Sequence, residues 1–290
     1  MSVGNRMSQN LPKNREDDIG NHLIIAALKV ETSNVEAITV AKTMAIAQET
    51  GLFGKRKESR HYAKKILEEY PQFTGSYFAY EPNADQDDKA YLRQVGTENG
   101  GLDAHGRFLP YWFRDIKDPS NIKLNPLLDM ETSLYYQGVK DKFLSGSQEK
   151  YLVTEPYEYG GKMIIEHVYP VVIEGKFVGI AGVDRALTDL HAFLQGLKPY
   201  KTAELMLMSR LGKVIAATMD PGLQTKPMNE TPYKDILHSF YHNKTGRPNV
   251  GLLTDPVDGK QYFYGGVPIT TGDWTLVMRV SEAEILSLQK

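Results

Sequence analysis

Two segments of the chain carry side chains that could hold a small molecule. In residues 169–184, two apolar runs flank Glu174 and Gly175, which predicts a β-hairpin whose second strand ends at the carboxylate of Asp184. Residues 106–115 read Gly-Arg-Phe-Leu-Pro-Tyr-Trp-Phe-Arg-Asp, which predicts an aromatic strand with charges at its ends. Together the two segments predict a box of aromatic rings around one anion, which is typical of binding rather than catalysis.

The sequence lacks the common motifs of catalysis. It contains no His-Glu-x-x-His pair, no Gly-x-Ser-x-Gly elbow, no phosphate-binding loop that ends in Gly-Lys-Ser/Thr, and no Gly-x-Gly-x-x-Gly. Cysteine is absent, which excludes disulfides, zinc–thiolate sites and thiol nucleophiles. We therefore expect no enzymatic activity, no metal and no cofactor.

Length and composition indicate a globular protein. The 290 residues suffice for two domains of about 100–200 residues each, and 41% of them are hydrophobic. The net charge is −2 and no basic block occurs, so the sequence gives no indication of nucleic-acid binding. It contains no apolar run of membrane-spanning length and no signal peptide, so the chain is either a soluble protein or the soluble part of a membrane protein.

The periodicity of apolar residues predicts an α+β fold. Residues 17–50 repeat apolar residues at helical spacing and predict one long amphipathic helix, for which Gly51 offers a stop; a second helix follows at 58–70. The next group has predicted strands at 74–80, 108–114, 151–154, 162–169 and 176–183, with helices at 124–146 and 187–197. A smaller group has strands at 203–209, 214–219, 250–255, 261–268 and 274–280, a short helix at 232–242 and a final helix from 281.

The order and spacing of these motifs resemble a double Cache domain, the extracytoplasmic sensor of bacterial and archaeal chemoreceptors and sensor histidine kinases. The resemblance covers roughly residues 20–285. It is carried by the Gly-Arg-Phe-Leu-Pro-Tyr-Trp-Phe-Arg run at 106–114, Thr-Glu-Pro-Tyr at 154–157 and the hairpin at 170–184, with Gly-Lys-Val-Ile at 212–215 and Trp-Thr-Leu-Val at 274–277 in the later part.

This resemblance implies a division of the chain into a helix and two modules. We expect a leader at 1–16 that is disordered or was added to the native chain, and a long helix at 17–56. A membrane-distal PAS-like module at 57–198 would bind the ligand, and a membrane-proximal PAS-like module at 199–282 would follow, each with a central antiparallel sheet. Residues 283–290 would begin a helix that leads to a membrane span.

The resemblance also suggests which residues bind the ligand. Asp184 matches the carboxylate that holds a ligand ammonium group in the family's amine and amino-acid sensors; the alternative is that it caps the following helix. Tyr157 matches the aromatic residue of the Glu-Pro-Tyr motif, or else packs in the core. Tyr111 and Trp112 match an aromatic pair, of which only one should face the pocket because neighbouring strand residues point in opposite directions. Aromatic faces there could also hold a cation.

Three further tyrosines are candidates for the same cavity. Tyr77 lies in the middle of a predicted strand and could line it. Tyr135 and Tyr136 lie on the predicted covering helix, and one of them, for which we choose Tyr136, could close over a ligand.

One departure from the family leaves the ligand open. Members that sense amino acids carry an arginine two residues before the aromatic pair, and Leu109 stands there. Arg107 and Arg114 are near but displaced. Arg114 and Asp115 are candidate ligand-binding residues, or could instead form a surface pair of little energetic value. A cation without a carboxylate (an amine, a polyamine or a quaternary ammonium) fits Asp184 equally well, and a small acid bound by an arginine is a third possibility.

We therefore predict an extracytoplasmic sensor domain of a cell-membrane protein. It should bind a small polar, amine-bearing ligand and pass a conformational signal across the membrane through flanking spans. Predicted partners are that ligand (an amine, amino acid or small carboxylate) and a second copy of the chain along the long helix. Three alternatives stay open: a sensor for a small carboxylate, a PAS-like adaptor without a ligand, and a hydrolase with an unrecognised site.

Overall fold

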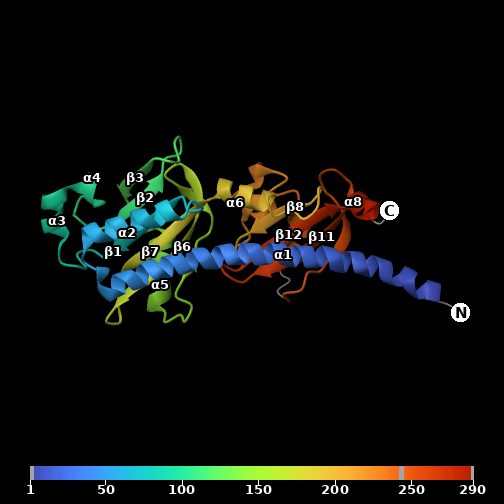
Figure 1. The fold of residues 1–290 in the computed structure, drawn as a ribbon, viewed down its shortest axis with the longest axis horizontal. Coiled ribbons are helices and arrows are strands. Elements are labelled where there is room, and N and C mark those ends of the chain that lie inside the picture. The colour runs from blue at the N-terminus through green and yellow to red at the C-terminus, as the bar shows by residue number, and fades with distance from the viewer. Residues whose placement is uncertain (1–2, 242–244, 289–290) are drawn as a thin grey trace. The chain divides into compact units, whose positions relative to one another are not determined.

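The computed structural model describes residues 3–241 and 245–288, with side chains from residue 14 onward. The chain divides into two compact units: residues 34–186 form one, and the described residues up to 33 together with those from 187 onward form the other. The division falls between Ala186 and Leu187, whereas the module boundary predicted from the sequence lies at residues 198 and 199. Each unit contains one antiparallel sheet, so the predicted α+β class with two sheets is confirmed (Figure 1).

The long helix α1 (Val3–Ala47) begins well before its predicted start at residue 17. The predicted leader of residues 1–16, disordered or added to the native chain, is helical in the backbone described from Val3 onward; residues 1 and 2 lie outside the described part. A π-helical turn, η1 (Gln48–Leu52), follows α1, and Gly51 within it has a φ of 128°, a conformation that glycine adopts readily. The chain leaves the helix there and reverses into α2 (Arg56–Glu69).

The unit of residues 34–186 is built on a seven-stranded antiparallel sheet. The strand order is β3-β2-β1-β7-β6-β4, and β5 pairs with β6 outside this path. The β6–β7 hairpin turns at Glu174 and Gly175, both of which have positive φ, as a two-residue hairpin turn requires. The strands are β1 (Gly75–Tyr80), β2 (Pro110–Arg114), β3 (Ile122–Pro126), β4 (Leu152–Val153), β5 (Tyr157–Tyr159), β6 (Lys162–Ile173) and β7 (Lys176–Ala186).

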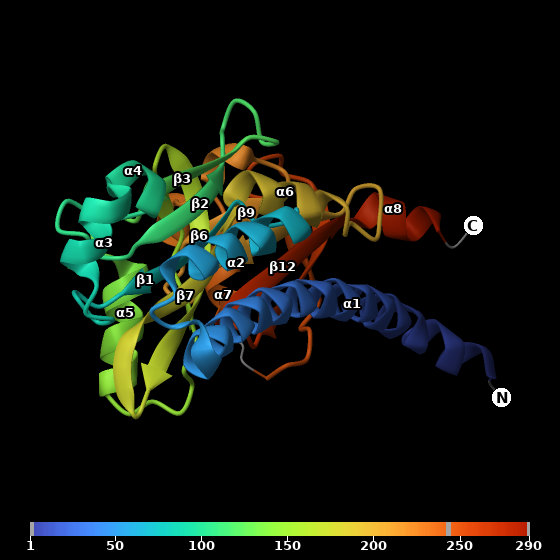
Figure 2. The same cartoon turned by 60° about the vertical axis from the view of Figure 1, so that its left-hand side comes forward.

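The two faces of this sheet have different covers. The C-terminal part of α1 and α2 lie over one face (Figure 2). Their apolar side chains form one cluster with Phe78 and Val183 of the sheet. The other face packs against α5 (Leu134–Leu144), whose N-cap Ser133 accepts a hydrogen bond from the amide of Tyr136. Short helices α3 (Asp88–Val95) and α4 (Thr97–Gly100) lie in the connection between β1 and β2.

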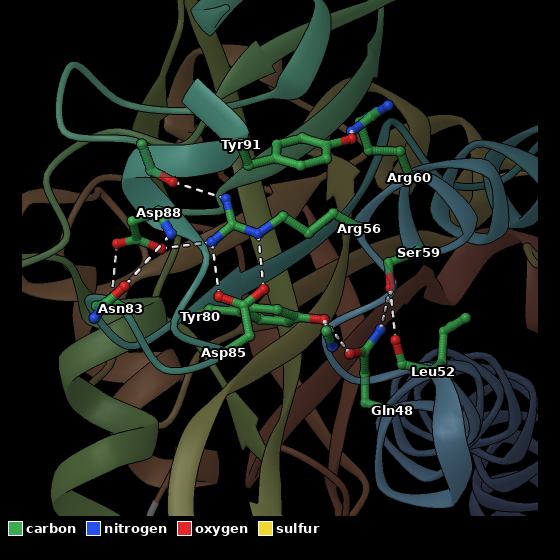
Figure 3. A network of polar contacts seen from close by, with 12 residues as sticks. Gln48, Leu52, Arg56, Ser59, Arg60, Tyr80, Asn83, Asp85, Asp88 and Tyr91 are labelled. Carbon is green, nitrogen blue, oxygen red and sulfur yellow. Dashed lines mark hydrogen bonds and ion pairs between the residues drawn. The ribbon is translucent and has the colours of Figure 1, made fainter. Parts of the chain in front are cut away.

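A buried polar network fixes the turn between α1 and α2 to the segment that follows β1 (Figure 3). The guanidinium of Arg56 donates to both oxygens of Asp85, at 2.7 and 2.8 Å, and to Asp88. It also donates to the carbonyl of Gly106 at 2.8 Å. Tyr80, at the end of β1, donates its hydroxyl hydrogen to Gln48. The network thus holds the end of β1 in place.

The second unit has a five-stranded antiparallel sheet in the order β10-β11-β12-β8-β9. Its strands are β8 (Glu204–Met208), β9 (Val214–Ala217), β10 (Gly251–Thr254), β11 (Gln261–Ile269) and β12 (Trp274–Ser281). Its helices are α6 (Leu187–Gln195), η2 (Pro221–Leu223), η3 (Met228–Glu230), α7 (Lys234–Tyr241) and α8 (Glu282–Ser287). Of the helices described, none is long and apolar enough to cross a membrane.

Candidate functional site

The side chain of Asp184 points into the interior of the unit of residues 34–186. Asp184 lies near the end of β7, paired with Gly75 on β1 and with Glu166 on β6, and it is completely buried. Its Oδ2 accepts a hydrogen bond of 2.6 Å from the hydroxyl of Tyr111. Its Oδ1 is buried and has no hydrogen-bond partner among the described residues. A buried carboxylate oxygen without a donor is costly, so this atom marks a place where a donor is favoured.

The alternative role of Asp184 as a helix cap does not fit this geometry. Helix α6 begins at Leu187, and the carboxylate of Asp184 accepts no hydrogen bond from a main-chain amide in the described chain. Its main-chain carbonyl instead accepts from the amide of Thr74 at 2.9 Å, as part of the sheet. The carboxylate is therefore held by a tyrosine on the inner face of the sheet.

A second buried carboxylate lies directly beside Asp184. Glu166 is its cross-strand partner on β6, so the two side chains project from the same face of the sheet. Glu166 is almost fully buried, and its carboxylate accepts a hydrogen bond from the hydroxyl of Tyr157. Its main chain is fixed by Thr154, whose Oγ1 accepts from the Glu166 amide at 3.0 Å. Two carboxylates are thus brought together without a basic residue between them.

Five tyrosines surround the two carboxylates: Tyr77 on β1, Tyr111 on β2, Tyr135 on α5, and Tyr157 and Tyr159 on β5. The ring centroids of Tyr77 and Tyr111 are 5.9 Å apart, those of Tyr77 and Tyr135 are 5.8 Å apart, and those of Tyr111 and Tyr159 are 5.5 Å apart. All three pairs meet edge to face, which is a favourable arrangement for aromatic rings. The hydroxyl of Tyr77 is buried without a hydrogen bond.

Two glycines make room for these rings. A Cβ atom at Gly75 would lie 2.4 Å from the Tyr111 ring and 2.6 Å from Oδ2 of Asp184. A Cβ atom at Gly182 would lie 2.4 Å from the hydroxyl of Tyr77. All three distances are far inside van der Waals contact, so the aromatic rings can lie over the strands only where the strands carry no side chain.

A cavity of about 330 Å³ opens beside the tyrosines, a volume suited to a small molecule. Tyr111 and Tyr159 line it, and Tyr111 also donates to Asp184. Lys162, at the start of β6, also lines it, with Nζ 5.2 Å from the centre of the Phe113 ring and a hydrogen bond to the carbonyl of Arg114. The remaining lining residues are Phe113, Asn125, Pro126, Leu128 and Gly160.

The edge of the cavity at Leu128 is fastened by two of the tyrosines. The Leu128 amide donates to the hydroxyl of Tyr159 at 2.9 Å, and the hydroxyl of Tyr135 donates to the Leu128 carbonyl. Leu128 itself is 56% exposed, so this segment is tied to the rest of the unit by hydrogen bonds more than by packing.

Burial changes the protonation of both carboxylates. Desolvation raises the pKa of Asp184 from 3.8 to about 6, although the hydrogen bond from Tyr111 and the charge of Lys162 favour the ionised form. Desolvation also raises the pKa of Glu166 well above its usual range, and the neighbouring charge of Asp184 raises it further. The pair therefore holds a proton more readily than two exposed acids would.

Three predicted site residues lie elsewhere. Trp112 points to the opposite face of the sheet, where its indole donates to the carbonyl of Arg60 at 2.9 Å; the side-chain alternation that places Tyr111 in the site excludes Trp112. Arg114 projects on that same side and donates to the carbonyl of Phe73 at 2.9 Å and to carbonyls at the end of α2, as a helix C-terminal cap does. Asp115 pairs with Lys123 at 2.7 Å near the surface.

Tyr136 lies in the same hydrophobic cluster as Tyr77 and Tyr111, but its hydroxyl is directed away from Asp184. It donates to Glu81, and the Arg107 guanidinium lies 4.9 Å from the centre of its ring. Its neighbour Tyr135 supplies the ring that meets Tyr77. Of the predicted residues, the structure thus brings together Asp184, Tyr157, Tyr111 and Tyr77.

Glu166 and Tyr159 were not predicted as site residues, and of the two tyrosines on the covering helix the prediction chose Tyr136 instead of Tyr135. Glu166 is the one acid inside the apolar run of residues 163–173, and a charge in a buried strand indicates a function or a partner. Tyr159 lies two residues after Tyr157 and so shares its face of the strand. For metals, the described residues contain no cluster of three or more His, Cys, Asp or Glu side chains that could hold an ion.

Comparison with known proteins identifies the fold. No family model matches the chain, and no curated protein matches it. Among solved structures, the extracellular domain assigned to the histidine kinase mmHK1S-Z3 is 26% identical, with a TM-score of 0.75 over 90% of this chain and 92% of that one. Methyl-accepting chemotaxis protein X is 24% identical, with a TM-score of 0.75 over 94% of this chain and 100% of that one. The ligand-binding domain of the Pseudomonas fluorescens chemoreceptor CtaA, solved with L-isoleucine, is 16% identical, with a TM-score of 0.63 over 97% and 98% of the two chains.

The chain accordingly has the fold of the extracellular sensor domains of histidine kinases and chemoreceptors, and the predicted resemblance to double Cache domains is confirmed. The similar structures include an extracellular domain of a histidine kinase and a periplasmic sensory domain of a chemoreceptor. The likeness to CtaA, at its low identity, concerns the fold alone.

Proposed function

We propose that the unit of residues 34–186 is the ligand-binding part of an extracytoplasmic sensor and that it binds a small molecule through an amine group. One observation carries the proposal: Asp184 is completely buried among tyrosines, and its Oδ1 has no donor. A protonated amine supplies both the missing hydrogen bond and the missing positive charge. A charge-assisted bond of this kind is about twice as strong as a neutral one.

The surroundings of Asp184 favour a cation in a second way. The rings of Tyr77, Tyr111 and Tyr159 meet beside the carboxylate, and aromatic faces attract a cation by about 0.5–2 kcal/mol. The cavity beside them has space for the remainder of a small ligand, with Phe113 and Pro126 as apolar wall.

A ligand that also carries a carboxylate is the second candidate, and Lys162 is the observation that favours it. Leu109, at the position of the family's ligand-clamping arginine, is buried in the core cluster and offers no charge. Lys162 does line the cavity, so the carboxylate of an amino acid or of a small acid could be received there. The L-isoleucine of the CtaA structure shows that a protein of similar fold takes an amino acid.

The signal would leave the unit along the chain that carries Asp184. Strand β7 ends at Ala186, two residues after Asp184, and α6 begins at once at Leu187. In this proposal residues 57–198 are the membrane-distal module and residues 199–282 the membrane-proximal one, and membrane spans outside this chain receive the displacement. A ligand shifts such an equilibrium only through its differential affinity for the two states, typically 1–3 kcal/mol.

A homodimer along α1 belongs to the same proposal. Ile25, Leu28, Val35 and Ile46 are exposed apolar residues of this helix. Their spacings of three, seven and eleven residues place them on one side of an α-helix. A second copy of the chain would cover this surface.

Thermal-shift measurements with amines, amino acids and small carboxylates test the ligand class. A true ligand at about 100 times its dissociation constant adds about 2.7 kcal/mol of stability. We expect the shift with amine-bearing compounds, its loss in Asp184→Asn, and its retention in Asp115→Asn, which alters an acid paired with Lys123 outside the site. Stabilisation by an amine that survives Asp184→Asn contradicts the assignment of the anion, and a response to none of the three classes favours an adaptor.

A further inference from the structure

We infer that Glu166 is a second ligand-binding residue, which together with Asp184 selects a primary ammonium group over its N-methylated forms. This inference rests on the proposed function and narrows the ligand class within it. The sequence alone left amines, polyamines and quaternary ammonium ions as equal candidates, and the arrangement of acceptors in the site separates them.

The geometry provides two carboxylates for one nitrogen. Glu166 and Asp184 are directly opposite on the adjacent antiparallel strands β6 and β7, and side chains so paired have Cβ atoms about 5 Å apart. Both are buried, Asp184 accepts from Tyr111, which also lines the neighbouring cavity, and Glu166 accepts from Tyr157. A nitrogen between them can donate to both at the usual distance of about 2.7–2.9 Å.

The number of free acceptors matches a primary ammonium group, which has three N–H donors. Oδ1 of Asp184 is unpartnered, and the hydroxyl oxygen of Tyr77 is also buried without a hydrogen bond. The carboxylate of Glu166 accepts from Tyr157 on one oxygen and has remaining acceptor capacity. Tyr77 lies close enough to Glu166 to lower its pKa, and the charge of Asp184 raises it, so the three groups lie close together.

Each methyl group on the ligand nitrogen removes one of these donors and leaves a buried acceptor unpaired. That penalty corresponds to a loss of about tenfold or more in affinity per donor. A trimethylammonium group has no N–H donor and would leave all of these acceptors unpaired.

The charges around the pair suit one cation. The groups that face it are the five tyrosines from β1, β2, β5 and α5, together with Lys162 at the start of β6. Two ionised acids this close repel each other in a poorly solvated site, so the pair carries close to one negative charge before a ligand arrives. One ammonium group neutralises that charge, and the second ammonium of a diamine finds no matching carboxylate there.

Calorimetric titration of the whole chain tests this with n-butylamine, L-leucine and putrescine, followed by the mono-, di- and trimethylated forms of whichever binds. We expect affinity to fall about tenfold or more with each methyl group in the wild-type chain. Glu166→Gln should weaken binding of the primary amine at least tenfold. It should also reduce the difference in affinity between the primary amine and its methylated forms. Glu158→Gln, an exposed acid on β5, should behave as wild type.

The outcomes separate this inference from the proposed function. If a primary amine binds through Asp184 but methylation or Glu166→Gln changes its affinity less than twofold, the inference is wrong and the proposed function stands. If none of the primary amines binds, both are wrong. The methylation series needs no variant, so it decides the matter even where Glu166→Gln does not fold.

Discussion

Replacement of Asp184 by asparagine should stabilise the ligand-free protein at neutral pH. The substitution keeps the shape of the side chain and removes its charge, while an asparagine carbonyl can still accept from the hydroxyl of Tyr111. A buried acid kept for ligand binding costs folding free energy until the ligand arrives. If the acid instead stabilised the folded state, its replacement would lower the free energy of unfolding. The sign of the change in unfolding free energy therefore distinguishes the two roles.

The magnitude follows from the raised pKa of Asp184. A rise from 3.8 to about 6 means that the folded state binds the proton more tightly than the unfolded chain does. The resulting contribution to stability is fully present below about pH 4 and is lost as the pH rises through 6. At 1.36 kcal/mol per pKa unit, ionised Asp184 costs about 3 kcal/mol at pH 7.5. Because the new amide group needs acceptors of its own, we expect Asp184→Asn to gain about 1–3 kcal/mol at pH 7.5 and little at pH 4.

Urea unfolding of wild type and variant at pH 4 and pH 7.5 measures this difference. Asp115→Asn is the matched control: Asp115 is near the surface and paired with Lys123, so its replacement should change the free energy of unfolding by no more than about 0.5 kcal/mol. A variant less stable than wild type at pH 7.5, or a gain equal at both pH values, would refute the reasoning.

Three further perturbations test how the site is held. Gly75→Ala places a Cβ atom against the Tyr111 ring, so it should abolish ligand binding and lower the free energy of unfolding by about 1–3 kcal/mol. Gly251→Ala is the control, because its Cβ meets no atom within 4 Å, and it should change neither quantity. Equal ligand binding by the two variants would contradict the need for glycine at position 75. Arg56→Met leaves the acids around it unpaired and should lower the free energy of unfolding by about 3–5 kcal/mol in denaturant titrations; a loss below 1 kcal/mol would show that the network is not needed. Trp112→Phe should leave ligand affinity within twofold of wild type in calorimetry, because its ring lies on the opposite face of the sheet; a tenfold loss would return Trp112 to the site.

The local pattern of the sequence was sufficient for the main elements of the fold. Alternating apolar residues and the Glu174–Gly175 turn predicted the β6–β7 hairpin, because side-chain alternation and positive φ are properties of a few neighbouring residues. Gly51 predicted the end of the long helix for the same reason. The start of that helix was placed too late, since residues 3–16 carry no apolar period to announce it.

The site itself was only partly predictable. Asp184 and Tyr111 could be singled out, because an acid at the end of an apolar strand and an aromatic pair are visible in the sequence. Which member of the pair faces the pocket depends on strand register, and Trp112 could be assigned to the other face only once β2 was paired with β1. The same applies to Arg114, whose donors are used by the carbonyls at the end of α2.

The sequence by itself determined that the chain is a cysteine-free α+β protein, and it predicted one carboxylate, Asp184, as a ligand-binding group. Only the tertiary structure decided that Glu166 lies beside that carboxylate and that Tyr135 and Tyr159 complete the surrounding rings. The physical reason is that periodicity records which face of its own strand or helix a residue occupies. Which residues from separate elements meet is fixed by pairing and packing, and those depend on the whole unit.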